Sequence, residues 1–103
     1  MRIILVYDVS VEEPKDQVRL NKVRKIARKY IHHIQKSVFE GDITPSNLER
    51  LKKEILEVVD RNRDSVIIYE LGEFKSYRRY ILTEGKDPSG NHNLITPQNR
   101  SLL

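Results

Sequence analysis

The run of residues 2–7 constrains the fold of this chain more than any other feature, because it reads RIILVY with no alternation of apolar and polar residues. Its β-branched and aromatic composition predicts a strand. On that strand Ile3 and Leu5 would point to one face of the sheet, and Ile4 and Val6 to the other. Both faces are apolar, so the fold must cover this strand from two sides.

Two amphipathic helices are predicted from the spacing of the apolar residues. Between residues 15 and 31 the apolar positions recur at intervals of three and four, which is the period of a helix with one buried face. Thr44 and Pro45 predict the start of a second helix, because threonine is a favoured N-cap and proline suits the first helical position. Residues 32–43, between the helices, are expected to be extended, with a break near Ser37.

The order of these elements indicates the fold class. A strand is predicted at 65–71, and a weaker strand signal follows at 77–83. The sequence of strand, helix, broken strand, helix and strand predicts an α+β, ferredoxin-like sandwich in which two helices cover one face of an antiparallel sheet. Because the helices cover only one face, we expect a homodimer that packs through the sheets. We assign residues 1–84 to the domain and residues 85–103 to a C-terminal tail.

Positive charge is concentrated in one segment. The net charge is +4, yet residues 15–36 hold eight basic side chains and a single acidic one. A local field of one sign attracts polyanions, whereas the alternative is a solvated helix face. The expected nucleic-acid-binding residues are Lys15, Arg19, Lys22, Arg24, Lys25, Arg28 and Lys29.

Several classes of protein are excluded by composition. The chain contains no cysteine, which rules out disulfides and thiolate metal sites. No apolar run approaches the ~20 residues that cross a bilayer, and no secretory signal is recognisable at the N-terminus. We therefore expect a cytoplasmic protein with no membrane association.

Asp8, at the end of the first strand, is the main candidate for a functional carboxylate. One interpretation is a turn residue that accepts hydrogen bonds from backbone N–H groups just ahead of it. The other depends on the dimer, in which the two Asp8 carboxylates would meet and repel unless a cation lay between them. A shared Mg²⁺ completed by waters would relieve this repulsion and would activate water against a phosphodiester. His33 is a further candidate for an acid or base, against the alternative of an ordinary polar residue at a strand entry.

Four segments carry a resemblance to a known family: VYDVS at 6–10, RLNKV at 19–23, IQKSVFEGDI at 34–43 and DSVIIYEL at 64–71. Together they resemble the CRISPR-associated Cas-two family, whose members are ferredoxin-like homodimers. The resemblance implies catalytic roles for Asp8 and Tyr7, with Asp8 as the metal ligand. By the same resemblance, Arg19 and Lys22 correspond to the basic residues at the start of the family's first helix. The implied supporting residues are Asn21, His33, Ser37 and Phe39, of which His33 stands where some members have arginine.

The same resemblance implies the biological role. Such a protein would bind double-stranded DNA as a scaffold with the CRISPR integrase during spacer acquisition, and would act as a Mg²⁺-dependent endonuclease on RNA or DNA. It would also place a short strand, at about 92–96, in the partner's sheet. Two alternatives stay open: a toxin-like ribonuclease of the virulence-associated D type, and a small-molecule regulatory module on the same fold.

Overall fold

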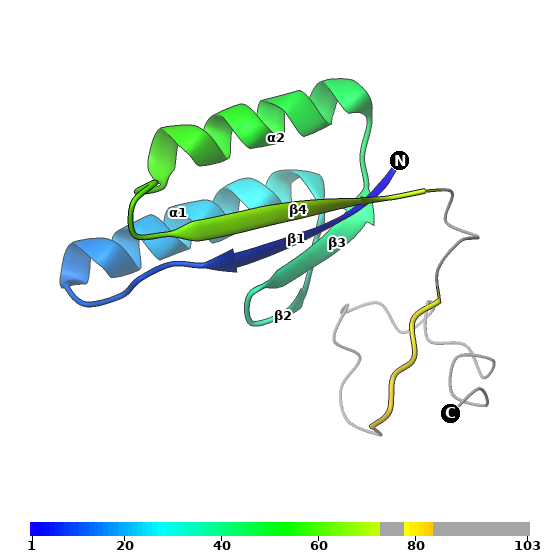
Figure 1. The fold of residues 1–103 in the computed structure, drawn as a ribbon, viewed down its shortest axis with the longest axis horizontal. Coiled ribbons are helices and arrows are strands. Elements are labelled where there is room, and N and C mark those ends of the chain that lie inside the picture. Colours follow the sequence, from blue (N-terminus) through cyan, green and yellow to red (C-terminus); the bar gives the residue numbers. More distant parts are fainter. Residues whose placement is uncertain (73–77, 84–103) are drawn as a thin grey trace.

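A four-stranded antiparallel sheet carries both helices on one face (Figure 1). The computed structural model describes residues 1–72 and 78–83. The elements are β1 (Arg2–Asp8), α1 (Pro14–Tyr30), β2 (His32–Gln35), β3 (Val38–Asp42), α2 (Pro45–Val58) and β4 (Ser65–Leu71), and the strand order is β2-β3-β1-β4. This arrangement confirms the predicted α+β, ferredoxin-like sandwich.

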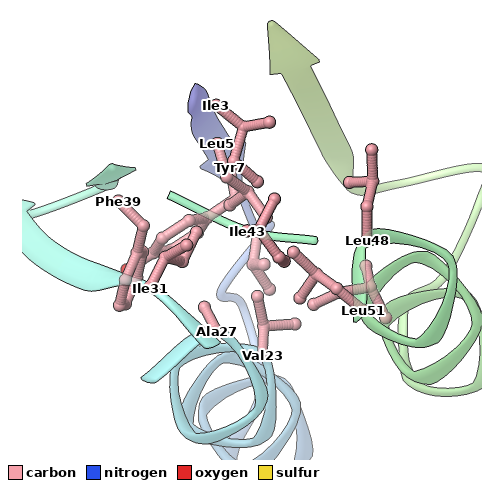
Figure 2. Close-up of a cluster of buried hydrophobic side chains, with 12 residues drawn as sticks. Ile3, Leu5, Tyr7, Val23, Ala27, Ile31, Phe39, Ile43, Leu48 and Leu51 are labelled. Carbon is pink, nitrogen blue, oxygen red and sulfur yellow. The ribbon is translucent and has the colours of Figure 1, made fainter. Parts of the chain in front are cut away.

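The central strand β1 is paired on both sides, antiparallel to β3 and to β4. Ile3, Leu5 and Tyr7 face the helices and are buried in the main apolar core (Figure 2). Val23 and Leu51 supply the helical side of that core and are fully buried. Burial along β1 has a period of two, so the structure covers the helix-facing side of the strand, and cover of the other side stays a prediction.

The opposite face of the sheet is open in the single protomer. Ile4 lies opposite Tyr69, and Val6 lies opposite Ile67, so the four side chains form one apolar patch across β1 and β4. Ile67 and Tyr69 are 46% and 53% exposed. A second copy is the predicted cover for this open face, and the dimer stays a prediction.

Each helix begins with proline at its first position. Thr44 caps α2, where its hydroxyl accepts a hydrogen bond from the backbone N–H of Asn47 at 3.1 Å. Helix α1 begins at Pro14, one residue earlier than predicted. Proline suits the first position of a helix, which Pro14 occupies in α1 as Pro45 does in α2. Within the parts of the chain that are described, no helix has the length and apolarity to span a membrane.

The predicted break near Ser37 is confirmed, since residues 36 and 37 form the turn between β2 and β3. Gly41 lies inside β3 and is buried. A Cβ atom there would come within 2.9 Å of Cγ2 of Ile31, so glycine allows β3 to approach the end of α1.

The weaker strand signal at 77–83 is wrong for residues 78–83, which form no strand. Instead Arg79 reaches back and binds the carboxylate of Glu40 at 3.0 Å. The tail at 85–103 and its expected short strand at about 92–96 lie outside the described residues.

Candidate nucleic-acid interface and metal-binding carboxylate

Asp8 ends β1 opposite Ser65, on the same open face as Ile4 and Val6. Its side chain is exposed, and within residues 1–72 and 78–83 it makes no hydrogen bond or ion pair. The turn interpretation requires bonds from the backbone ahead, and none is present. Asp8 is thus a carboxylate on the exposed face with its oxygens available.

Asp8 belongs to no cluster of metal-ligating side chains among the described residues. No group of three or more histidine, aspartate or glutamate side chains converges anywhere in the described part of the chain. Mg²⁺ accepts one or two carboxylates with waters in the remaining positions. One Asp8 carboxylate with waters, or two such carboxylates from two copies of the chain, would each suit Mg²⁺.

Tyr7 lies on the other side of the sheet from Asp8 and is only 3% exposed. Its hydroxyl donates to the backbone carbonyl of Lys36 at 2.6 Å and accepts from Nε of Arg24 at 3.0 Å. Both hydrogen-bonding directions of the hydroxyl are thus occupied within the protein. The geometry makes Tyr7 a bracing residue between β1, α1 and the β2–β3 turn.

Three of the four predicted supporting residues, His33, Ser37 and Phe39, lie at or beside the same turn. The ring of His33 stacks on Phe39 with centroids 4.6 Å apart and an interplanar angle of 17°. Its Nε2 lies 2.9 Å from the Lys36 carbonyl, to which it donates. The Ser37 carbonyl accepts from the backbone N–H of Tyr7 at 3.1 Å. His33 and Ser37 thereby fix the turn, while Asn21 lies apart on α1 and accepts from Gln17 at 3.1 Å.

Arg19 was expected to face nucleic acid, but its guanidinium is directed inward. Its Nε lies 2.6 Å from Oδ2 of Asp64, and its Nη1 lies 2.7 Å from Oδ1 of Asp16. Its Nη2 donates to the Ser10 carbonyl at 3.1 Å. The side chain is 13% exposed and both carboxylates are fully buried. Arg19 therefore holds the loop after Asp8 against α1 and β4.

Arg63 completes this network by binding Asp16 at 3.0 Å. Asp16 also accepts from the backbone N–H groups of Glu12 and Glu13. The Arg63 guanidinium, those backbone donors and Arg19 hold the pKa of Asp16 well below its usual range. The pKa of Asp64 is lowered in the same way, chiefly by the hydrogen bond from Arg19 and also by the backbone N–H groups of residues 60 and 10.

The remaining cations of α1 fall into two groups. Lys15 binds Glu13 at 3.3 Å, and Lys29 pairs with Glu54 of α2, which raises the pKa of Lys29. The cations that bind no carboxylate among the described residues are Lys22, Arg24, Lys25 and Arg28. This second set is the part of the predicted basic surface that the structure leaves available to an anion.

Sequence reasoning missed the carboxylates that matter most for the interior. Asp64 follows Arg61, Asn62 and Arg63, and a charged residue in such a polar stretch is normally solvated. Its partner lies 45 positions away in the sequence, so local patterns carry no signal for the pair. Glu40 is a further buried carboxylate, held between Arg2 and Arg79.

Comparison with known proteins places the chain in a family. Residues 1–79 match the sequence model of the family described as CRISPR associated protein Cas2. The chain belongs to this family. The match spans β1 through β4, so it covers the whole sheet, the two helices and each residue of the candidate site.

Individual Cas2 proteins agree with this assignment. The chain is 47% identical over 89 residues to a CRISPR-associated endoribonuclease Cas2 of Moorella thermoacetica, covering 86% of this chain and 98% of the relative. It is 43% identical over 88 residues to the CRISPR-associated endoribonuclease Cas2 of Thermococcus kodakarensis, covering 85% of this chain and 94% of the relative. The crystal structure of Streptococcus pyogenes Cas2 superposes with a TM-score of 0.71 at 32% identity, covering 81% of this chain and all of that one.

Proposed function

We propose that this Cas2-family protein is a homodimeric, Mg²⁺-dependent endonuclease that cleaves RNA at its paired Asp8 carboxylates. The observation that carries the proposal is the state of Asp8, which is exposed, unpaired within the described residues and next to the open apolar face. The relatives from M. thermoacetica and T. kodakarensis are named endoribonucleases, which supports RNA as the substrate class.

The dimer would bring the two halves of the site together. Packing of two open faces would cover Ile67 and Tyr69 and would carry Asp8 of each copy toward the two-fold axis. The two carboxylates would hold one Mg²⁺, which when bound lowers the pKa of a coordinated water and supplies the nucleophile. The exposed cations Lys22 and Lys25 lie on the helical layer and would contact RNA phosphates away from the cleaved bond.

The experiment compares the wild-type protein with Asp8→Asn, using single-stranded RNA in Mg²⁺ and in EDTA. The substitution keeps the size of the side chain and removes its charge, so we expect loss of cleavage with unchanged dimerisation and RNA binding. Glu70→Gln is the matched control, because Glu70 is also an exposed strand carboxylate. Equal cleavage by wild type and Asp8→Asn would refute the role of Asp8, and EDTA-resistant cleavage would refute the role of the metal.

A second function is favoured by the separation of Asp8 from the basic surface. Asp8 points to the open face, whereas Lys22, Lys25 and Arg28 lie on the helical layer on the other side of the sheet. Holding a duplex on α1 therefore does not require the carboxylates. We propose that the protein also binds double-stranded DNA as a scaffold for the CRISPR integrase during spacer acquisition. Spacer acquisition that persists with Asp8→Asn and fails when Lys22 and Lys25 are replaced by alanine would support this role.

A further inference from the structure

The Tyr7 hydroxyl is a buried polar group with unusual partners. It connects a backbone carbonyl in the β2–β3 turn to the Nε atom of Arg24 on α1. A hydroxyl in the core needs a hydrogen-bond partner, and one carbonyl would satisfy that need. The second bond acts on Arg24: it fixes the plane of a long side chain that would otherwise sample many rotamers.

Arg24 differs from Arg19 in how its nitrogens are used. Arg19 donates from Nε, Nη1 and Nη2, each to an oxygen of the protein. Arg24 donates only from Nε, and no described residue accepts from its two terminal nitrogens. A guanidinium held through Nε presents both Nη groups as a planar fork, which matches two oxygens of a phosphate.

The surroundings of this fork are cationic and adjoin the turn. Arg28 is four residues further along α1, on the same side of the helix, and is exposed. Lys36 has an exposed side chain in the turn whose carbonyl Tyr7 binds. His33 also faces this turn, through its bond to the Lys36 carbonyl. In Figure 1 the β2–β3 turn lies at the same end of the sheet as the end of β1. A nucleic-acid backbone that crosses this end on the helical side of the sheet would meet Arg24.

We propose that Arg24 binds a backbone phosphodiester of nucleic acid at the β2–β3 turn, and that Tyr7 is the positioning residue that orients its guanidinium. Tyr7 is thereby not a catalytic residue, because its hydroxyl is occupied on both sides and lies behind the sheet from Asp8. This site deepens the proposed function and rests on it, since the ligand is the nucleic acid that the protein would hold or cleave.

The test is a double-mutant cycle between Tyr7→Phe and Arg24→Ala, with binding of a fluorescently labelled single-stranded RNA measured by anisotropy across salt concentrations. Arg24→Ala should weaken binding about tenfold and reduce the salt slope by about one phosphate contact. Tyr7→Phe should weaken it less, and its effect should vanish in the Arg24→Ala background. Arg24→Lys should bind more weakly than wild type, because lysine keeps the charge and loses the fork.

Controls separate this inference from the proposed function. Lys22→Ala should lose one phosphate contact and should add to Tyr7→Phe without coupling. Thermal melting of each variant shows whether the protein is folded at the assay temperature. Additive effects of Tyr7→Phe and Arg24→Ala would overturn the positioning role. The positioning role would also be overturned if Tyr7→Phe lowered the cleavage rate at saturating RNA and left RNA binding unchanged. A wild-type protein that binds no RNA or DNA at low salt would instead refute the proposed function.

Discussion

Tyr7 and Asp8 are consecutive residues whose side chains lie on opposite faces of the sheet. Tyr7 is 3% exposed and packs beneath the helices, whereas Asp8 is exposed on the open face. The alternation of a strand enforces this separation. The adjacent tyrosine and aspartate thus lie in two different environments, one in the core and one at the surface.

We expect Arg19→Ala to destabilise the protein strongly. The substitution would leave Asp16 and Asp64 buried with fewer donors, and an uncompensated buried charge is costly. The melting temperature should fall by roughly 10 °C or more. Arg19→Lys should recover part of the loss, and Lys22→Ala, at an exposed site one turn away, should leave the melting temperature nearly unchanged. A melting temperature for Arg19→Ala equal to that of Lys22→Ala would contradict the structural role of Arg19.

The same network predicts the pH dependence of stability. The pKa values of Asp16 and Asp64 are lowered in the folded state, chiefly by Arg63 and Arg19 respectively. A lowered folded pKa gives stability that is complete above the unfolded value, about 3.9 for aspartate, and is lost as the pH falls below it. The free energy of unfolding should therefore decline below about pH 4. Urea titrations of the wild type and Asp64→Asn should give the steeper decline for the wild type; parallel curves would count against the assignment.

Gly41→Ala should destabilise the protein by about 1–3 kcal/mol, because the new methyl group would overpack the interior. The alanine Cβ would lie 2.9 Å from Cγ2 of Ile31 and 3.1 Å from its Cβ. Ile31→Ala removes the nearest of these atoms, so the double variant should lose less stability than the sum of the single ones. Denaturant unfolding of the four proteins measures this coupling, and strict additivity would show that the contact is unimportant.

Ile67→Lys should convert the proposed dimer to monomers. The substitution places a charge in the centre of the open face, where burial against a second copy would require its desolvation. Leu56→Lys is a matched control, since Leu56 is 49% exposed on α2 while Ile67 is 46% exposed on β4. Sedimentation equilibrium at micromolar concentration should show monomer for Ile67→Lys and dimer for Leu56→Lys. A dimer in both variants would place the interface elsewhere.

Local patterns were sufficient to predict most of the fold. Rules that act over a few residues predict three features: the apolar run at residues 2–7, the proline at the start of α2 and the break near Ser37. Helix α1 begins one residue before its predicted start, because the apolar pattern that predicts the helix does not include Pro14. The strand predicted at 77–83 is absent from residues 78–83, where Arg79 binds Glu40, which lies 39 positions earlier.

Such local rules predict less of the candidate site than of the fold. Every basic residue of α1 looked equivalent in sequence, yet Arg19 is enclosed by carboxylates while Arg24 is braced by Tyr7. The difference depends on where Asp64 and the β2–β3 turn lie in space. Asp8 could be identified because it ends the strand, and its availability followed only from the absence of donors around it within the described residues.

The position of β4 at the outer end of the strand order has a consequence for the life of the protein in a cell. Its outer backbone groups have no neighbouring strand in the described part of the chain, and Ile67 and Tyr69 are exposed on the same element. Edges of this kind promote pairing with unrelated chains. In a newly made protomer, dimerisation would therefore compete with aggregation. The yield of functional protein should then depend on how close two copies are during translation and on the supply of chaperones, as well as on the stability of the fold.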